Sequence, residues 1–273
     1  KGMSRPRPVF ENESLMLTRG TVARRFRLRA CKRTNHILRY VVAVMCKKWR
    51  IRLHAITAMS NHWHLCLTDP EANIVRFQRD VHAFVARALN MVEGDSESLW
   101  SNEPGNRVTC VEPDDLLDKI AYTMVNPVEA GLVRHARSWP GVRHCWPQKP
   151  LTVLRPKRFF RGADQRGSWP EEAQLILHRP PGYESISDDT LASTVQGLIA
   201  AREQHFHEEF RRTRRRFLGR RAILRQSRNS SPKTKREARD IKPTFACKNK
   251  HLRNERLKAI KAWRVEYGEA LRA

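Results

Sequence analysis

Two short apolar segments joined by a two-residue turn constrain the fold of this chain most. Residues 51–59 (IRLHAITAM) and 62–67 (HWHLCL) have the pattern of β-strands, and Ser60–Asn61 separates them. Such a short connection joins antiparallel neighbours, so the pattern predicts a β-hairpin. In its second strand His62 and His64 are two positions apart and share one face, while Trp63 points the other way. The two histidines either pack within the strand or hold a common ligand.

The segments around this hairpin predict an α+β fold. Apolar alternation and 3.6-residue periodicity indicate a strand at 15–22, a helix at 35–49 with Asn35 as its cap, a helix at 69–92 with Pro70 in its first turn, a strand at 107–111 and a helix from Pro113. The order is therefore β-α-β-β-α-β-α. Its first six elements match the ferredoxin-like βαββαβ plan, an antiparallel sheet with helices on one face.

Charge and composition divide the chain into three parts. Residues 191–273 hold 23 Lys and Arg against 8 Asp and Glu, so +15 of the net charge of +25 lies in the last third. We expect a core at 14–147, a connecting segment at 148–189 that is rich in Pro and Gly, and a basic, mainly helical extension at 190–273. Within that extension a helical pattern spans 190–226, polar residues fill 227–250, and a last helix covers 252–271.

The net charge of +25 is typical of a protein that binds a polyanion, either nucleic acid or an acidic membrane surface. No stretch approaches the ~18 uninterrupted apolar residues of a membrane span. The first residues, KGMSRPRPVF, lack the apolar region of a signal peptide. The six cysteines are scattered without a C-x-x-C pair, which argues against a zinc ribbon or a disulfide framework. A cytoplasmic, reduced protein that does not span a membrane is expected.

The helix from Pro113 brings a second set of polar residues. At about 100° per residue its apolar positions fill one half of the helix, while Asp118, Tyr122 and Asn126 fall on the other half. Tyr122 and Asn126 are one turn apart and therefore neighbours. The plain alternative is an exposed tyrosine above an asparagine that Pro127 follows as the helix closes.

The two polar sets together suggest one chemistry. An ion held by His62, His64 and an amide oxygen acts as a Lewis acid on a phosphoryl oxygen, and a tyrosine beside it can form a covalent phosphotyrosine. A free phenol is protonated near neutrality, so its attack needs a polarised phosphate. In a chain of this charge, such a set predicts the cleavage of nucleic acid.

These residues also carry a family resemblance. AMSNHWHLCL at 58–67, followed 58 residues after His64 by YTMVNPVEAGLV, resembles the motifs M-P-N-H-x-H and Y-x-x-x-N-P-x-x-A-G-L-V of the REP-associated tyrosine transposases, which are single-tyrosine HUH transposases. The resemblance covers about residues 14–147. Two positions depart from it: Ser60 replaces proline, and Glu129 stands where arginine is usual.

The resemblance implies a bacterial, cytoplasmic enzyme that cuts and transfers single-stranded DNA, often at hairpin-forming repeats, through a 5′-phosphotyrosine. It implies that His62, His64 and Asn126 bind Mg²⁺ or Mn²⁺ and that Tyr122 is the nucleophile. Ligand softness alone does not exclude Zn²⁺. Nothing in the sequence decides between a monomer and a dimer.

Two arginine clusters are candidates for DNA phosphate contacts, and a solvated surface is the alternative for each. The first follows the first strand and the second lies in RRTRRRFLGRR, which has no acidic residue: Arg24, Arg25 and Arg27, then Arg211, Arg212, Arg214, Arg215, Arg216, Arg220 and Arg221. For His54 we expect a hydrogen-bonded strand histidine rather than a ligand, and for Trp100 a packed side chain.

Two other functions stay open at this point. A domesticated protein that binds repeat DNA or RNA without catalysis would need the basic clusters but not the two histidines, the tyrosine and the asparagine. A relaxase or replication initiator of the wider HUH group would share the chemistry but matches the Y-x-x-x-N-P motif less closely.

Overall fold

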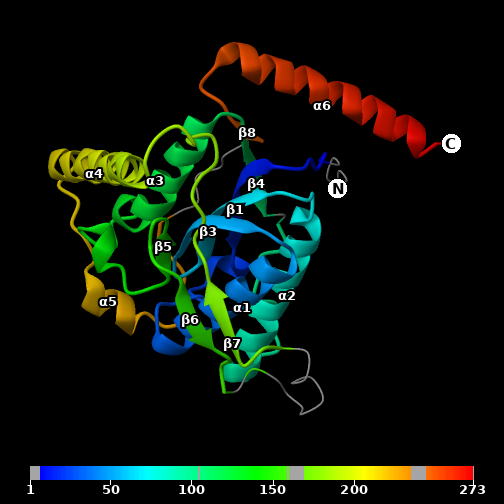
Figure 1. Ribbon diagram of the computed structural model, residues 1–273. Helices are drawn as coiled ribbons and strands as arrows, with labels where there is room; N and C mark the ends of the chain where they lie inside the picture. The colour runs from blue at the N-terminus through cyan, green and yellow to red at the C-terminus, as the bar shows by residue number, and fades with distance from the viewer. Residues whose placement is uncertain (1–6, 104, 158, 160–168, 235–243, 273) are drawn as a thin grey trace.

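The predicted hairpin lies inside a six-stranded sheet (Figure 1). The computed structural model describes residues 7–103, 105–157, 159, 169–234 and 244–272. The sheet has the order β5-β2-β3-β1-β4-β8, and its pairs are antiparallel except β4 with β8. Its strands are β1 Glu13–Gly20, β2 Arg52–Ala58, β3 His62–Asp69, β4 Asn106–Cys110, β5 Arg143–Cys145 and β8 Phe245–Ala246.

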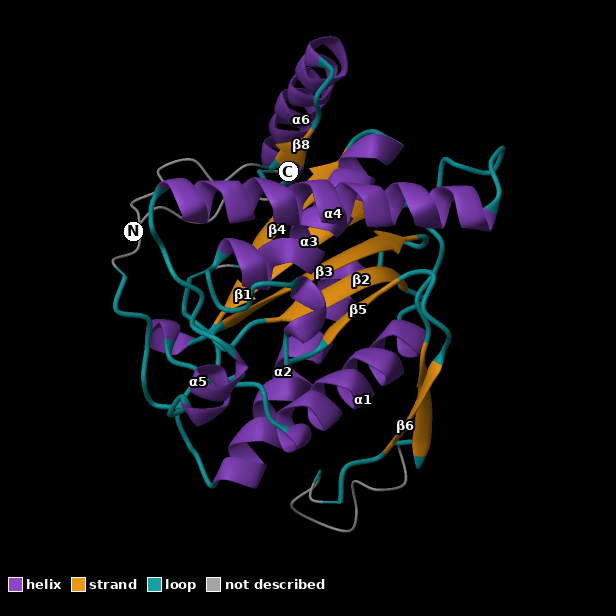
Figure 2. Ribbon diagram, turned by 90° about the vertical axis from the view of Figure 1, so that its left-hand side faces the viewer, coloured by secondary structure: helices purple, strands orange, loops and turns teal. Residues whose placement is uncertain are grey.

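Helices cover both faces of this sheet (Figure 2). The two helices of the first six elements, α1 Lys32–Lys48 and α2 Ile74–Glu93, pack against each other on one face. On the other face α3 Pro113–Glu129 crosses the strands, and α4 Asp188–Arg212 lies along α3. The ferredoxin-like core with its two helices on one face is therefore confirmed, and α3 and α4 add a further layer opposite them.

Side-chain alternation along β3 explains why both faces need a cover. Trp63 points toward α2, where its ring centroid lies 5.7 Å from that of His82. Cys66 points toward α3, where its Sγ lies 3.3 Å from Oγ1 of Thr123. A slip of one residue would exchange these faces and bury the wrong set. In the register of β3 with its two neighbours, His64 lies opposite Thr18 of β1 and opposite Thr57 of β2.

Two predicted helix starts are wrong, and each has a local reason. The cap of α1 is Cys31, whose Sγ accepts from the Thr34 N–H at 3.4 Å. Asn35 is buried inside that helix, and its Nδ2 donates to the Pro140 carbonyl at 2.8 Å. The second helix starts at Ile74, because the Asp69 carboxylate accepts the backbone N–H of Ile74 at 2.6 Å.

The chain beyond 147 adds layers to the core. The connecting segment holds a hairpin of β6 Leu151–Leu154 and β7 Glu172–Leu175 that contacts α1, and a structured hairpin was not predicted there. The predicted helical pattern at 190–226 forms two helices, α4 and α5 Arg220–Arg225. The predicted last helix is α6 Lys250–Ala270. The polar stretch 227–250 contributes β8 to the sheet, and its residues 235–243 lie outside the described residues. None of the described helices is both long and apolar enough to cross a membrane.

Candidate active site

The two histidines of β3 meet the polar side of α3 where the helix crosses the sheet. The ring centroids of His62 and His64 are 4.9 Å apart, and that of Tyr122 lies 5.4 Å from His64 at an interplanar angle of 79°. The Asn126 side chain lies close enough to His62 to raise the pKa of that histidine against the effect of burial. The structure thus brings together the four residues that the sequence singled out from two segments.

The start of α3 and its buried half hold Tyr122 and Asn126 in place. Glu112 and Asp115 form a capping box at the first turn. The apolar half of the helix is buried against the sheet and α4, as the wheel predicts. The helix continues to Glu129 with Pro127 inside it, although the sequence suggested closure at that proline. Asn126, one turn after Tyr122, is 6% exposed and faces inward.

The imidazole of His64 is oriented by one hydrogen bond and leaves its second nitrogen without a protein partner. Its Nδ1 lies 2.8 Å from Oγ1 of Thr18 on the neighbouring strand. Its Nε2 is buried without a hydrogen-bond partner among the described residues. A buried polar atom left so costs ~1–3 kcal/mol and therefore calls for an explanation. Coordination of a cation by Nε2 would satisfy it.

His62 is oriented in the same way by its preceding residue. Its Nδ1 donates to Oδ1 of Asn61 at 2.8 Å, so Nε2 keeps its lone pair. Burial lowers the pKa of His62 to about 4, against the Asn126 hydrogen bond, and the charge of Arg24 lowers it further. Burial and the neighbouring His62 hold the pKa of His64 well below its usual range. Both imidazoles are therefore neutral near pH 7, as ligation of a cation requires.

Three of the four residues, His62, His64 and Asn126, fit a divalent ion. The donors would be one nitrogen of each neutral imidazole and the amide oxygen of Asn126. The donor of His64 would be its orphaned Nε2. Each histidine has its other nitrogen fixed by an oxygen, Asn61 Oδ1 or Thr18 Oγ1, which is the usual outer arrangement of metal-bound histidines. Mg²⁺ prefers oxygen ligands and Mn²⁺ accepts imidazole more readily.

Tyr122 has a cation on its own helix nearby. The Lys119 ammonium lies 5.9 Å from the Tyr122 ring centroid and 3.4 Å from the Asp118 carboxylate. Asp118, which the wheel placed on the same stripe, turns to α4 and pairs with Arg202. The polar half of α3 therefore serves two neighbours: Tyr122 and Asn126 face the histidines, and Asp118 fastens α4.

The three arginines of the first cluster have different surroundings. Arg24 lies near His62 and donates to the Thr234 carbonyl at 2.8 Å. Arg25 forms a 2.6 Å ion pair with Glu97. Arg27 is 4% exposed and pairs with Asp95 and Glu97, so it presents no free face to a phosphate.

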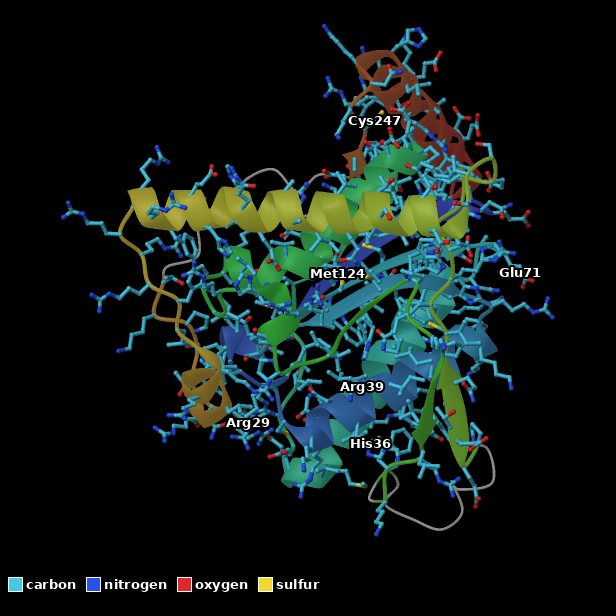
Figure 3. All side chains as sticks on the ribbon, turned by 60° about the vertical axis from the view of Figure 1, so that its left-hand side comes forward. Arg29, His36, Arg39, Glu71, Met124 and Cys247 are labelled. Atoms are coloured by element: carbon cyan, nitrogen blue, oxygen red, sulfur yellow. The ribbon has the colours of Figure 1, made fainter. Side chains whose placement is uncertain are left out.

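The second arginine cluster is exposed. All seven of its side chains lie at the surface and make no ion pair within the described residues; they are Arg211, Arg212, Arg214, Arg215, Arg216, Arg220 and Arg221. Figure 3 shows long side chains with nitrogen tips fringing the end of α4 and α5, with Arg29 beside α5. The guanidinium of Arg215 lies over the Phe210 ring, 4.2 Å from its centroid.

A strap, residues 218–234, links this cluster to the histidines. Its first backbone N–H groups, of Leu218 and Gly219, donate to the carbonyls of residues 131 and 132 after α3, at 2.8 and 2.9 Å. Farther along, Oε1 of Gln226 accepts from Ser60 Oγ at 3.2 Å, at the turn that precedes His62. The strap, which includes Arg220 and Arg221, therefore runs from the loop after α3 to the turn that precedes His62.

Some residues of this site were not singled out by the sequence. Thr18 orients His64 from a strand 46 residues earlier, and only the register of β1 against β3 reveals it. Lys119 stands three residues before Tyr122, so helical spacing could have found it. His54 is hydrogen-bonded on both nitrogens, to Thr68 and the His178 carbonyl, which confirms the packing interpretation. Trp100 is buried and packs against Trp63, with ring centroids 5.2 Å apart and planes tilted by 34°, also as expected.

Comparison with known proteins yields structural matches only. No protein-family model matches the sequence, and no curated protein does. A REP-associated tyrosine transposase solved bound to a REP hairpin is similar in structure, with 14% identity and a TM-score of 0.44 over 59% of this chain and 98% of that one. A provisionally assigned transposase from Deinococcus radiodurans R1 matches with 19% identity and a TM-score of 0.31, over 39% of this chain and 85% of that one. The first of these proteins is of the family that the sequence motifs resemble.

Proposed function

We propose that this chain is a metal-dependent endonuclease and strand transferase of the REP-associated tyrosine transposase type, acting on single-stranded, hairpin-forming repeat DNA. One observation carries the proposal: the buried, unpartnered Nε2 of His64 lies beside His62 and Asn126, with the Tyr122 ring in contact with that histidine. A purely structural histidine pair would have no need for an orphaned nitrogen at this position.

His62, His64 and Asn126 would hold Mg²⁺ or Mn²⁺, which when bound supplies Lewis-acid polarisation of a phosphoryl oxygen. The Tyr122 hydroxyl attacks the scissile phosphorus and its proton passes to solvent. The bond from phosphorus to the 3′ oxygen breaks, and that oxygen takes up a proton. The products are a 5′-phosphotyrosine and a free 3′ hydroxyl. Attack of a second 3′ hydroxyl on the phosphotyrosine reverses these steps and joins new strands.

Residues around the site have supporting roles in this proposal. The Lys119 ammonium, 5.9 Å from the Tyr122 ring, favours the phenolate that develops during attack. Arg24 and the exposed arginines of the strap and of the end of α4 hold the DNA backbone. The rigid contacts of Thr18 and Asn61 keep both imidazoles in place as substrate arrives.

The test is Tyr122→Phe, assayed with a hairpin oligonucleotide and Mn²⁺. The variant should form no denaturant-resistant DNA adduct while it binds the same DNA with unchanged affinity, because only the hydroxyl is removed. Tyr267→Phe, on the exposed face of α6, is the matched control and should form the adduct normally. Cleavage by the Tyr122→Phe protein at the normal rate would exclude Tyr122 as the nucleophile.

A nucleic-acid-binding protein without catalysis is the second candidate function. The seven exposed arginines favour it on their own, because they bind phosphates whether or not the histidines hold an ion. Titration with Mg²⁺ and Mn²⁺ separates the two functions. DNA that remains uncut at every concentration of either ion, while still bound, would support the binding protein.

A further inference from the structure

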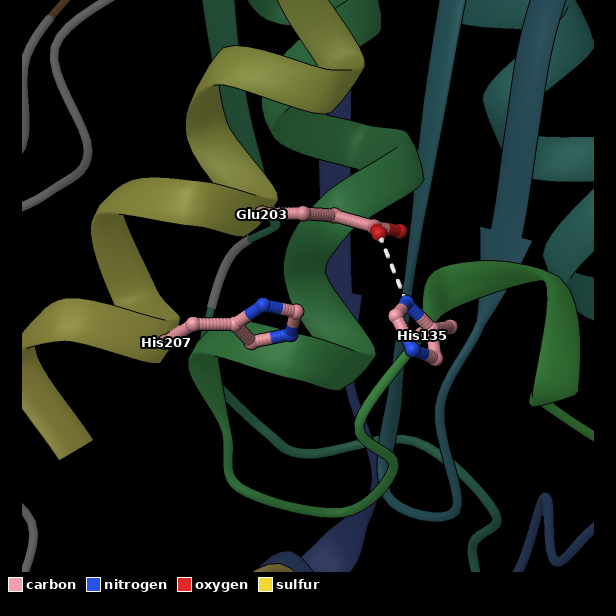
Figure 4. A group of neighbouring side chains, drawn as sticks. All are labelled: His135, Glu203 and His207. Atoms are coloured by element: carbon pink, nitrogen blue, oxygen red, sulfur yellow. Dashed lines mark hydrogen bonds and ion pairs between the residues drawn. The ribbon is translucent and has the colours of Figure 1, made fainter. Parts of the chain in front are cut away.

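A second group of histidines lies between α4 and the loop that follows α3. His135 comes from that loop, and Glu203 and His207 come from successive turns of α4 (Figure 4). One potential ligand atom from each of the three side chains lies within 4.8 Å of the other two. We propose that His135, Glu203 and His207 form a zinc-binding site that joins α4 to this loop, separate from the ion of the candidate active site.

The distances suit tetrahedral coordination. Nδ1 of His135 lies 3.3 Å from Oε2 of Glu203. Two ligands of a tetrahedral zinc ion, each ~2.0–2.1 Å from it, stand ~3.3 Å apart. The rings of His135 and His207 have centroids 5.3 Å apart and stand nearly perpendicular, at 88°. His207 is half-buried, and its ligand atom lies within 4.8 Å of those of the other two residues.

Outer hydrogen bonds already orient two of the three side chains. Oε1 of Glu203 accepts from the backbone N–H of Ala136 at 2.7 Å, which turns Oε2 toward His135. Nε2 of His207 lies 2.6 Å from the Arg134 carbonyl and donates to it, which leaves the Nδ1 lone pair for an ion. Metal-bound histidines commonly donate their second N–H to a carbonyl in this way.

The donor types select the ion. Two imidazoles and one carboxylate suit Zn²⁺, whereas Mg²⁺ favours oxygen ligands throughout. Arg143 lies within electrostatic reach of Glu203: burial lowers the pKa of this arginine, and the charges of Cys145 and Glu203 oppose that shift. Its Nε is committed to the Met124 carbonyl at 3.1 Å, so it does not occupy the carboxylate. The side chains of His135 and Glu203 are 42% and 18% exposed, which gives an ion access from solvent.

Another group of possible ligands does not support a site. Glu112, Asp115 and Cys247 gather at the start of α3. There the two carboxylates accept backbone N–H groups in the capping box, and Asp115 also accepts from Lys248. Helix capping explains that group, whereas no such role explains the pairing of His135 with His207.

The test measures zinc binding by the full chain without DNA. The background variant is His64→Ala, which removes the ion site on β3. After chelator treatment this protein should bind one equivalent of Zn²⁺ in calorimetry, with a rise in melting temperature that Mg²⁺ does not reproduce. Adding Glu203→Gln, which can keep the Ala136 hydrogen bond, or His207→Ala should remove that equivalent and the rise. Adding His205→Ala, an exposed histidine of the same helix, should leave both unchanged.

Two results would overturn the site. The first is a His64→Ala protein that binds no Zn²⁺. The second is the same zinc stoichiometry in the Glu203→Gln and His207→Ala proteins, with far-ultraviolet circular dichroism showing both folded. Neither result depends on DNA cleavage, so a failure of the zinc site and a failure of the proposed nuclease are distinguished.

Discussion

The two histidine clusters of this chain are built in opposite ways. His62 and His64 sit on a central strand, and burial lowers the pKa of both. His135 and His207 sit on a loop and on an outer helix, where the side chains keep contact with solvent. The first cluster is fixed by the core of the sheet, and the second by the docking of α4 on α3.

The difference in structural support determines what each histidine cluster can do. A pair on a central strand, with His64 buried and His62 half-buried, holds its donors in one geometry before any ligand arrives, which catalysis at a phosphate requires. A half-exposed group between two elements is assembled only when those elements dock, so an ion bound there contributes chiefly to holding α4 in place.

The largest effect is expected from His64→Ala. Removal of this ligand should lower Mn²⁺-dependent DNA cleavage by more than about 100-fold, because even the loss of outer contacts to a metal ligand costs ~10–100-fold. His205→Ala, at an exposed histidine of α4 that belongs to neither cluster, is the control and should cleave normally. Initial rates on a hairpin oligonucleotide measure both, and a His64→Ala rate within threefold or so of wild type would contradict the assigned role.

Thr18→Val should have a smaller effect of the same kind. It removes the hydroxyl that orients Nδ1 of His64 at 2.8 Å but preserves the shape of the side chain. We expect the Mn²⁺ concentration for half-maximal cleavage to rise ~10-fold, with the rate at saturating Mn²⁺ nearly kept. Thr18→Ser retains the hydroxyl and should restore the wild-type titration. Equal weakening by both substitutions would point to packing instead.

Much of the core could be predicted because its information is local. Alternation in 51–67 gives the hairpin, and periodicity gives the three helices of the core. The helix starts were missed where a residue outside the helix supplies the cap, as Asp69 does for Ile74. The strand β8 consists of only Phe245–Ala246, and it pairs with β4 far away in the sequence, so no local pattern indicates it.

The same contrast applies to the two clusters. His62 and His64 could be identified because a single strand sets their relative position. Glu203 lies 68 residues after His135 and 67 after Ala136 in the sequence, and only the packing of α4 on α3 brings it to their loop. Arg27 shows the reverse case: its segment resembles a basic surface, but its carboxylate partners Asp95 and Glu97 come from a distant loop.

A third prediction concerns the pH dependence of stability that buried histidines impose. Burial lowers the pKa of His54 to about 4 from the usual 6.5. As the pH falls, His54 therefore takes up a proton in the unfolded chain before it does so in the folded chain. The contribution of neutral His54 to the free energy of unfolding is complete above pH 6.5 and is lost as the pH falls toward 4. Between pH 7 and pH 5 this loss is about 2 kcal/mol for one such group.

Urea unfolding of His54→Gln at the two pH values measures this effect. The variant is less stable than wild type at pH 7, since it loses a satisfied buried group, but its free energy of unfolding should fall about 2 kcal/mol less between pH 7 and pH 5. His205→Ala should retain the wild-type dependence. An unchanged dependence in His54→Gln would mean that this imidazole is not buried in its neutral form.

The smallest effect is expected at the strap that passes the rim of the candidate active site. Arg220→Gln with Arg221→Gln removes two exposed charges from the strap, without touching any proposed metal ligand. If both contact phosphates, the salt dependence of binding to single-stranded DNA should lose a slope of about 1.4, or ~0.7 for each contact. Cleavage at saturating DNA should stay the same, because the substituted charges act in binding alone.

Arg50→Gln is the matched control for this last prediction. Its guanidinium pairs with Glu71 at 2.7 Å, and Figure 3 shows Glu71 on the side of the molecule away from α5. The control should leave the salt slope unchanged. A double variant with the wild-type slope would mean that DNA does not follow the strap, and that the backbone reaches Tyr122 from another side. A double variant that also loses cleavage at saturating DNA would assign the strap a part in shaping the buried cluster itself.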